Sequence, residues 1–328
     1  MEITEFGPDD HERVRRFVEI TNAVRRADSP WVHPMTEHEC EGLLRHHWDG
    51  EPPAAFLATV DGEPVGTAEF QTSEYDNLHL AWLDLAVHPE HRRQGHGSAL
   101  LEAMTKRALA EGRTSVGTGG WESEATRGFA ERHGLGLRMN EINRRQFPAE
   151  VDWALVEKLH TEALGHASSY EVVRRLGRTP DDELAALAEM TSAINDAPTD
   201  DLDIEDEVFT ADRMRAYEHA QTERGYQLHR VFARHRGTGQ LAGHTVVAVD
   251  AERPHLAEQH DTSVVAAHRG HRLGLLLKAD MMLWLRETQP QVESVDTWNA
   301  ASNDHMIGVN EALGYRVMGR ALAFQKSI

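Results

Sequence analysis

The stretch from Leu83 to Gly97 decides the fold and reads LDLAVHPEHRRQGHG. Its apolar start is typical of a buried central strand, and residues 97–111 that follow have helical periodicity. Glycines at such a junction let a ligand approach the backbone closely, and the free N–H groups at a helix start attract anions. The stretch therefore predicts a pyrophosphate site between a strand and a helix. A glycine pair alone is weak evidence for it.

The same pattern returns from His260 to Gly274 as HDTSVVAAHRGHRLG. Four residues recur at a separation of 177: Val87 and Val264, His91 and His268, Arg92 and Arg269, Gly97 and Gly274. Two glycines upstream, Gly62 and Gly66, keep the same separation from Gly239 and Gly243. A constant offset over so much of the chain indicates a duplicated domain, and a period of this length excludes a solenoid.

Length and composition agree with two domains. The chain has 328 residues, 40% of them hydrophobic and 27% charged, which is enough to bury a core in each half. The net charge of −20 argues against a nucleic-acid partner. The lone Cys40 excludes an internal disulfide and suits a reducing compartment. Because neither a membrane-spanning run nor a signal peptide is visible, we expect a soluble, cytoplasmic protein with no membrane partner.

The two halves repeat one order of elements. The first half is expected to contain strand 2–6, helices 9–26 and 36–48, hairpin 54–60 and 64–71, central strand 79–88, helix 97–111, strand 114–117 and helix 124–133. The second is expected to contain strand 169–175, helices 180–194 and 211–224, hairpin 228–235 and 241–249, central strand 260–266, helix 274–287, strand 292–297 and helix 301–313. We expect an α/β protein with domains at 1–150 and 168–328, joined by a connector at 151–167.

The segment from Val87 to Gly97 resembles the acetyl-CoA motif of the GNAT superfamily of N-acetyltransferases, an apolar strand followed by R/Q-x-x-G-x-G/A. The segment from Ala301 to Tyr315 resembles the late helix of that family. Since the two copies cover nearly the whole chain, the arrangement resembles duplicated members such as mycothiol synthase. The resemblance implies two tandem GNAT domains, each with a mixed, mostly antiparallel central sheet flanked by helices, and acetyl-CoA as the cofactor.

By this resemblance, strand residues pair with the pantetheine arm and loop amides hold the pyrophosphate. The strand residues are Leu85, Ala86 and Val87 in the first half and Ser263, Val264 and Val265 in the second. The loop and helix-start residues are Arg92, Arg93, Gln94, Gly95, His96, Gly97 and Ser98, and Arg269, Gly270, His271, Arg272, Leu273, Gly274 and Leu275. Arg272 stands where the family has its first glycine. It can still donate its backbone N–H, and its side chain could either reach a phosphate or block the groove.

Two further family positions differ between the halves. The family often has an asparagine eleven residues before the late glycine; Asn303 occupies that position in the second half and Ser123 in the first. Many members have a tyrosine general acid four residues before the same glycine. Ala130 and Asn310 stand there, so a tyrosine acid is missing from both halves.

Glu258 is the candidate catalytic base. Some family members carry a glutamate six residues before the motif valine, which gives Glu258 in the second half and Ala81 in the first. Because even offsets on a strand share a face, Glu258, His260 and Thr262 should point the same way. A solvated carboxylate at a strand end is the alternative.

Three more carboxylates lie near these strands. Asp84 and Asp261 are expected to be structural, and Glu69 is a minor candidate for the base in the first half.

The chemistry needs a neutral amine. Deprotonating an alkyl amine of pKa about 10.4 costs roughly 4–5 kcal/mol at pH 7, and a positioned carboxylate can accept the proton. Holding the amine against the thioester can contribute roughly 7–11 kcal/mol, so a missing tyrosine does not exclude catalysis.

We therefore expect an acetyl-CoA-dependent N-acetyltransferase that moves an acetyl group to a primary amine of a small molecule by direct attack on the thioester. Glu258 and Asn303 slightly favour the second half as the catalytic one, but the first half keeps the cleaner pyrophosphate loop, so the reverse assignment stays open. A non-catalytic acyl-CoA-binding or sensing protein, and a protein or peptide N-acetyltransferase, stay open as alternatives.

The acceptor site is the least defined part. Family members shape it with the loop between the first two helices, here residues 27–34 and 196–206. The second loop is acidic and would attract a cationic amine, although a solvated charged loop is the favoured alternative. Its acidic residues include Asp200, Asp201, Asp203, Glu205 and Asp206. The histidines lack supporting ligands, so we expect no metal. We expect a monomer with an internal pseudo-dimer, or a homodimer.

Overall fold

The computed structural model describes residues 1–328 and contains two compact units. Unit 1 comprises residues 1–141, 199–206 and 319–328, and unit 2 comprises residues 142–198 and 207–318. The units thus follow boundaries different from the division at residue 150 expected from the sequence. The chain enters unit 2 within one strand, returns to unit 1 for a short segment, and ends in unit 1.

Unit 1 is built on a mixed sheet. The strands follow the order β1 (Glu2–Phe6), β2 (Ala54–Val60), β3 (Glu63–Gln71), β4 (Leu80–Val87), β5 (Ser115–Trp121) and the end of β12 (Arg316–Ser327). Every pair is antiparallel except β4 and β5, which are parallel. The expected sheet type is therefore confirmed for this half.

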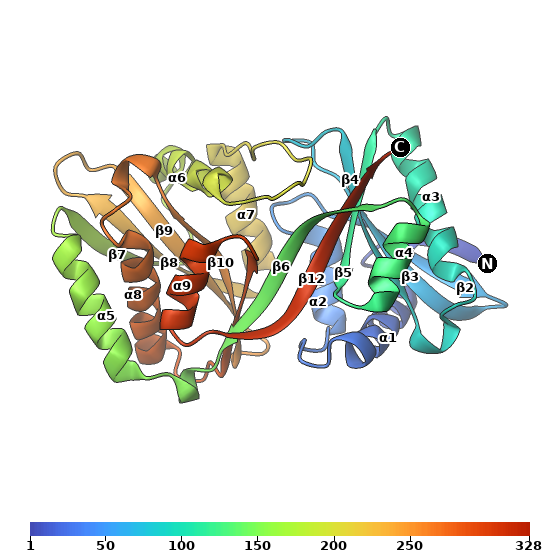
Figure 1. Ribbon diagram of the computed structural model, residues 1–328, viewed down its shortest axis with the longest axis horizontal. Helices are drawn as coiled ribbons and strands as arrows, with labels where there is room; N and C mark the ends of the chain where they lie inside the picture. The colour runs from blue at the N-terminus through green and yellow to red at the C-terminus, as the bar shows by residue number, and fades with distance from the viewer. The chain divides into compact units, whose positions relative to one another are not determined.

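Helices cover both faces of this sheet (Figure 1). They are α1 (His11–Asp28), α2 (Glu37–His46), α3 (His96–Ala110) and α4 (Glu124–Arg132). The face under α3 buries Leu83 against Leu100 and Met104, and the opposite face buries Leu57 against Phe17 of α1. Side chains alternate between the faces of a strand, so neighbouring residues of β4 point toward or away from α3.

Unit 2 repeats the architecture. Its strands follow the order β6 (Gly136–Gln146), β11 (Ser294–Ala300), β10 (Leu256–Val264), β9 (Leu241–Asp250), β8 (Tyr226–His235) and β7 (Tyr170–Leu176), of which β6 begins in unit 1. The β10–β11 pair is parallel, and the pairs among β7, β8, β9 and β10 are antiparallel.

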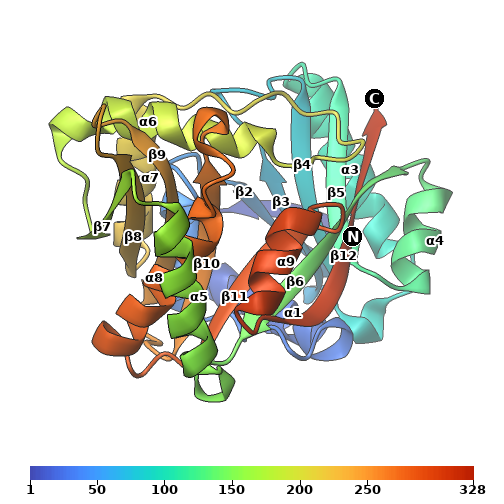
Figure 2. The same cartoon turned by 60° about the vertical axis from the view of Figure 1, so that its left-hand side comes forward.

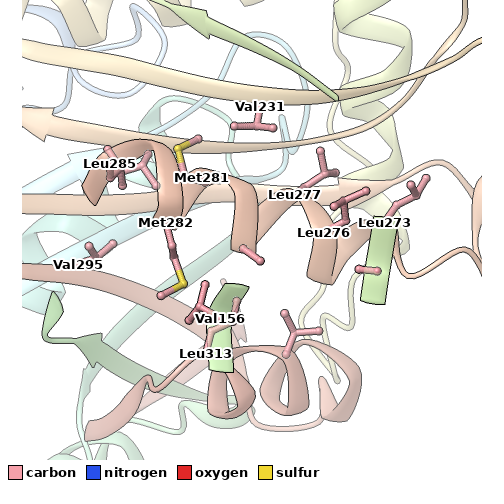
Figure 3. Packing of buried hydrophobic residues seen from close by; sticks show 14 of the residues in the cluster. Val156, Val231, Leu273, Leu276, Leu277, Met281, Met282, Leu285, Val295 and Leu313 are labelled. Carbon is pink, nitrogen blue, oxygen red and sulfur yellow. The ribbon is translucent and has the colours of Figure 1, made fainter. Parts of the chain in front are cut away.

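Two sets of helices enclose the sheet of unit 2 (Figure 2). One set consists of α5 (Trp153–His166), α8 (Leu273–Thr288) and α9 (Asp304–Ala312), and the other of α6 (Leu184–Thr191) and α7 (Ala211–Glu223). Leu276, Leu277 and Met281 of α8 pack on Val231 of β8 and Val295 of β11 (Figure 3). The second cluster, under α6 and α7, contains Leu187, Tyr217 and Phe232.

The segment 151–167, expected to be a connector, is mostly the helix α5. Val156 and Ala163 are buried at a spacing of seven residues and face the core that contains α8. This spacing puts both side chains on one stripe of a helix, which explains why the segment is helical.

Two strands, β6 and β12, were not predicted. In β6 the buried residues Asn143, Arg144 and Gln146 are polar, so the apolar alternation that predicts a strand is missing there. No helix of the structure is both long enough and apolar enough to cross a membrane.

Candidate acetyl-CoA and acceptor sites

In each unit the parallel pair of strands separates beside the glycine loop. β4 and β5 pair from Leu80 with Ser115 to Leu83 with Thr118, and then the pairing ends. β10 and β11 pair only as far as Glu258 with Asp296. The expected pantetheine-binding residues lie in the part of β4 or β10 beyond this pairing, except Val265, which directly follows β10. Their backbone groups can therefore pair with an extended ligand.

The two glycine loops share one backbone conformation. In unit 1, Arg93 and Gly95 have φ of +63° and +91°; in unit 2, Gly270 and Arg272 have φ of +86° and +55°. Arginine and glycine have exchanged places at the same two left-handed positions, which are 177 residues apart. The loop of unit 2 therefore keeps its backbone shape despite Arg272.

Both helices begin directly at these loops. Gly95 is the N-cap of α3 and Arg272 the N-cap of α8, and neither provides a side-chain cap. The first N–H groups of each helix thus lack a capping side chain, and such groups with the helix dipole suit a phosphate.

The side chains of Arg92 and Arg269 are engaged elsewhere. Arg92 donates from Nε to the Val87 carbonyl at 3.2 Å and binds both oxygens of Asp28 at 2.9 and 2.7 Å. Arg269 likewise donates to the Val264 carbonyl at 3.1 Å and forms an ion pair with Asp196. Asp28 is the last residue of α1 and Asp196 ends the 3-10 turn after α6, so each arginine fixes the strand end to the end of a helical segment. Both side chains are therefore already bound within the protein.

Of the two strands that lead into the glycine loops, β4 and β10, only β10 contains a β-bulge. Gln259 pairs with Val247 and Thr262 with Thr245, so three steps along β10 match two steps along β9. The pairing of β4 with β3 is uninterrupted from Trp82 to Val87.

The bulge changes which residues share a face. The hydroxyl oxygens of Thr262 and Thr245 are 2.7 Å apart, and Nε2 of Gln259 lies 3.0 Å from the same Thr245 oxygen. Gln259 in turn accepts a hydrogen bond from Lys278 of α8, so this group faces α8. The prediction that Thr262 points with Glu258 and His260 is wrong, because one extra residue reverses the alternation.

The bulge also changes the counterpart of Glu258. Leu80 pairs with Ser115 and Leu256 with Ser294, so before the bulge equivalent residues are 176 apart, and Glu258 corresponds to Trp82. Ala81, the counterpart expected from the sequence, lies in the core. The ring of Trp82 lies against Gly117, where an added Cβ would be 2.3 Å from it. Unit 1 therefore has an aromatic ring at this position instead of a carboxylate.

Glu258 lies next to His260, whose ring in turn contacts Tyr217. The side chain of Glu258 is 52% exposed, and its Oε2 is 3.7 Å from Nε2 of His260. The Tyr217 hydroxyl lies 2.7 Å from Nδ1 of that ring. Burial alone would raise the pKa of Glu258, but the nearby imidazole of His260 and its charge outweigh this and lower the pKa. The carboxylate is thus ionised at neutral pH and able to accept a proton.

Neither Tyr217 nor the role of His260 was anticipated. The two residues are 43 positions apart, on α7 and β10, and no local motif joins them. Only the packing of α7 over this face of the sheet brings them together.

Unit 1 contains a pair of neighbouring carboxyl groups. Glu69 and Asp84 are partners across β3 and β4, and Nε2 of Gln71 lies 3.4 Å and 2.9 Å from their oxygens. Burial, and then the charge of Asp84, raise the pKa of Glu69, and burial raises that of Asp84. Asp84 is still open to solvent at its tip, but the protein atoms around both groups disfavour a second charge.

Asn303 and Ser123 are both helix N-caps. Asn303 accepts the backbone N–H of Met306 at 3.2 Å, and Ser123 that of Thr126 at 3.0 Å. At the position of the family's tyrosine, Asn310 is buried and donates to Asn299 at 2.7 Å.

Most of the acidic segment that was expected at the acceptor site of the second half, residues 199–206, belongs to unit 1. Asp203 donates its backbone N–H to Gln325 at 2.7 Å, and Glu205 accepts the backbone N–H of Asn77 at 2.9 Å. These hydrogen bonds explain why the segment belongs to unit 1, although the residues before it in the chain belong to unit 2.

The structure has no group of three or more His, Cys, Asp or Glu side chains arranged to hold a metal ion.

Comparison with known proteins agrees with this geometry. Residues 18–135 match the acetyltransferase (GNAT) family model. An acetyltransferase of Sodalis glossinidius is 34% identical over 112 residues, which cover 34% of this chain and 70% of that protein. A mycothiol acetyltransferase of Stackebrandtia nassauensis is 36% identical over 98 residues, and the match spans only 30% of each chain.

Solved structures extend the likeness to the whole chain. A tandem GNAT protein from the clavulanic acid biosynthesis pathway has a TM-score of 0.79 and 25% identity, covering 99% of this chain and 98% of that one. A GCN5-related N-acetyltransferase from Sphaerobacter thermophilus shares the fold, with a TM-score of 0.68, 16% identity and coverage of 99% and 95%.

Two mixed sheets, each opening beside a glycine loop at a helix start, define a tandem acetyltransferase fold. The chain belongs to the GNAT family of acetyltransferases. The duplication expected from the sequence is confirmed.

Proposed function

We propose that the protein is an acetyl-CoA-dependent N-acetyltransferase that acts on a primary amine of a small molecule, with turnover in unit 2. The observation that carries this proposal is the bulged β10, which separates from β11 beside a glycine loop and places Glu258 and His260 at the separation. Membership of an acetyltransferase family supports the reaction type.

The proposed cofactor contacts are made by the backbone. The open edge of residues 263–265 pairs with the pantetheine arm, and the N–H groups of residues 270–275 bind the pyrophosphate. Residues 85–87 and 93–98 do the same in unit 1. Arg92 and Arg269 hold the strand end in place for these contacts.

Acetyl-CoA would supply a thioester that the neutral amine can attack: the C–N bond forms, the C–S bond breaks, and CoA leaves as a thiolate that takes up the second proton of the amine. Glu258 accepts the proton of the incoming ammonium group, and its lowered pKa keeps it ionised for this role. Tyr217 fixes the ring of His260, whose Nε2 faces the carboxylate. The bulge places a residue of β10 outside the β9 ladder, and its backbone N–H is the proposed donor to the oxyanion.

The first experiment is a calorimetric titration with acetyl-CoA, followed by CoA release over a panel of small amines and peptides. Binding with release driven by small amines supports the proposal. Absence of binding contradicts the cofactor, and faster release with peptides contradicts the small-molecule acceptor.

A second function is favoured for unit 1, namely acyl-CoA binding without turnover. Its β4 has no bulge, and Trp82 stands where unit 2 has Glu258. A variant that abolishes binding in unit 1 should therefore leave CoA release unchanged, and a loss of release would assign turnover to that unit.

A further inference from the structure

The sheet face of unit 2 under α6 and α7 contains buried polar side chains with unused hydrogen-bonding groups. Arg230 and His244 are each 1% exposed, and Ser263 is 6% exposed. Nε and Nη2 of Arg230, both ring nitrogens of His244 and Oγ of Ser263 have no hydrogen-bond partner in the protein. Buried polar groups are nearly always paired, so a concentration of unpaired ones points to a ligand that completes them.

The strand register places these three residues together. His244 pairs with Ser263 on β10 and with Phe232 on β8, and Arg230 pairs with Val246, two residues along from His244. Paired residues of antiparallel strands share a face. Phe232 and Val246 belong to the cluster with Tyr217 of α7, so this is the face that α6 and α7 cover.

Arg230 is fixed with one edge free. Its Nη1 donates to Glu218 at 2.7 Å and to the hydroxyl of Thr179 at 3.0 Å. Glu218 also accepts from Arg215 at 2.8 Å and from Thr179, so it already has several donors. The Nε and Nη2 groups on the other edge form the fork that binds a carboxylate through two parallel hydrogen bonds.

The charge of the site suits a monoanion. Burial, and then the charge of Arg230, lower the pKa of His244 to about 3, so its ring is neutral. One guanidinium already paired with Glu218 therefore supplies the only positive charge among the three residues. A carboxylate matches this balance better than a phosphate dianion.

We propose that Arg230, His244 and Ser263 bind a carboxylate of the acceptor, which makes the acceptor an amino acid or a close relative. This inference rests on the proposed acetyl transfer in unit 2. His260 of β10 is bound to Tyr217 of α7 on the same face, and β10 is two strands away from the β8 strand that carries Arg230, about 10 Å between backbones. One small molecule can thus place its carboxylate at Arg230 and its amine near Glu258.

The test uses the full-length protein saturated with CoA, so that binding is measured without turnover. Glycine, β-alanine and the common L-amino acids are compared by thermal shift and calorimetry with their carboxamides. At least one acid should bind at least tenfold more tightly than its carboxamide. Arg230→Lys keeps a cation beside Glu218 but lacks the fork, and should remove this preference.

The matched control is Arg174→Lys. Arg174 binds Asp280 of α8 through two hydrogen bonds on the opposite side of the sheet, so this variant should keep the preference. If Arg230→Lys fails to fold, Ser263→Ala removes one donor from the same site and should weaken acid binding at least threefold.

Equal binding of acids and carboxamides, no binding of any acid, or an unchanged preference in both Arg230→Lys and Ser263→Ala would overturn the carboxylate site. The proposed function is tested separately by acetyl-CoA binding to the wild type. Acetyl-CoA binding without an acid preference would refute only the carboxylate site. An acid preference without acetyl-CoA binding would refute the proposed function and leave the site standing.

Discussion

The side-chain oxygen of Gln259 lies 3.1 Å from Nζ of Lys278 beneath the bulge of β10. The amide nitrogen of Gln259 donates to the Val246 carbonyl at 2.6 Å, a backbone group beside the bulge. In unit 1 the corresponding core residues are Leu83 and Leu101, and β4 has no bulge. The Gln259–Lys278 pair thus occurs in unit 2, where the bulge interrupts the hydrogen bonds of β10.

Lys278 makes the stability of the protein pH-dependent. Burial lowers its pKa to about 7, below the ordinary value for lysine. The unfolded chain therefore binds one more proton than the folded chain between about pH 7 and 10. The destabilisation that buried Lys278 causes thus decreases as pH rises. The Tm of Lys278→Met relative to that of the wild type should be highest at pH 6, and this relative gain in Tm should be lost by pH 10. Leu101→Met is the control, and an advantage that stays constant with pH would contradict the prediction.

Gly95→Glu should weaken acetyl-CoA binding in unit 1 by at least tenfold. The new carboxylate would lie at the start of α3, where it repels the phosphates, and φ of +91° strains any side chain. Gly112→Glu is the control, because Gly112 also has a positive φ and open space but lies beyond the far end of α3. Calorimetric titration measures both. Equal losses in the two variants would mean that backbone strain, and not the loop, is responsible.

Glu258→Gln should lower CoA release with a small amine by about 100-fold or more, with little change in acetyl-CoA affinity. The pKa of Glu258 is below its ordinary value, so loss of its base form should not limit the rate at neutral pH. Tyr217→Phe should have a smaller effect in the same direction, because it frees the His260 ring. Glu171→Gln, on an exposed position of β7, is the control. Wild-type rates for Glu258→Gln would remove this residue as the base.

Glu69→Gln should stabilise unit 1 at pH 8 more than at pH 5. Burial and the neighbouring Asp84 raise the pKa of Glu69, so the folded chain binds more protons than the unfolded chain above the ordinary value for glutamate. Stability from this group is present at low pH and is lost as pH rises through the raised pKa. Thermal unfolding of the variant and the wild type at the two pH values checks this. A larger gain at pH 5 would refute it.

The repeated glycines Gly66 and Gly243 have a structural cause. Gly66 and Gly243 kept the offset of 177 because a Cβ there would lie 2.8 Å from the Ala86 carbonyl oxygen and 2.6 Å from that of Ser263. These glycines permit close packing of neighbouring strands. Their recurrence still revealed the duplication, since both copies need the same close approach.

The faces of β10 could not be read from the sequence. Side-chain alternation is a count of residues, and a bulge of one residue between Gln259 and Thr262 reverses it with no local signal. The assignment of Ala81 as the counterpart of Glu258 failed for the same reason. Register with the parallel neighbours, β5 and β11, corrected it.

The sequence by itself determined the duplication, the glycine loops and most helices and strands, because these depend on local periodicity, on glycine conformations and on a repeated spacing. Only the tertiary structure decided that residues 199–206 and 319–328 belong to unit 1, and that Arg230, His244 and Ser263 share one buried face. Such groupings join residues far apart in the chain through strand register and long-range hydrogen bonds. Those interactions exist only after the sheets have formed.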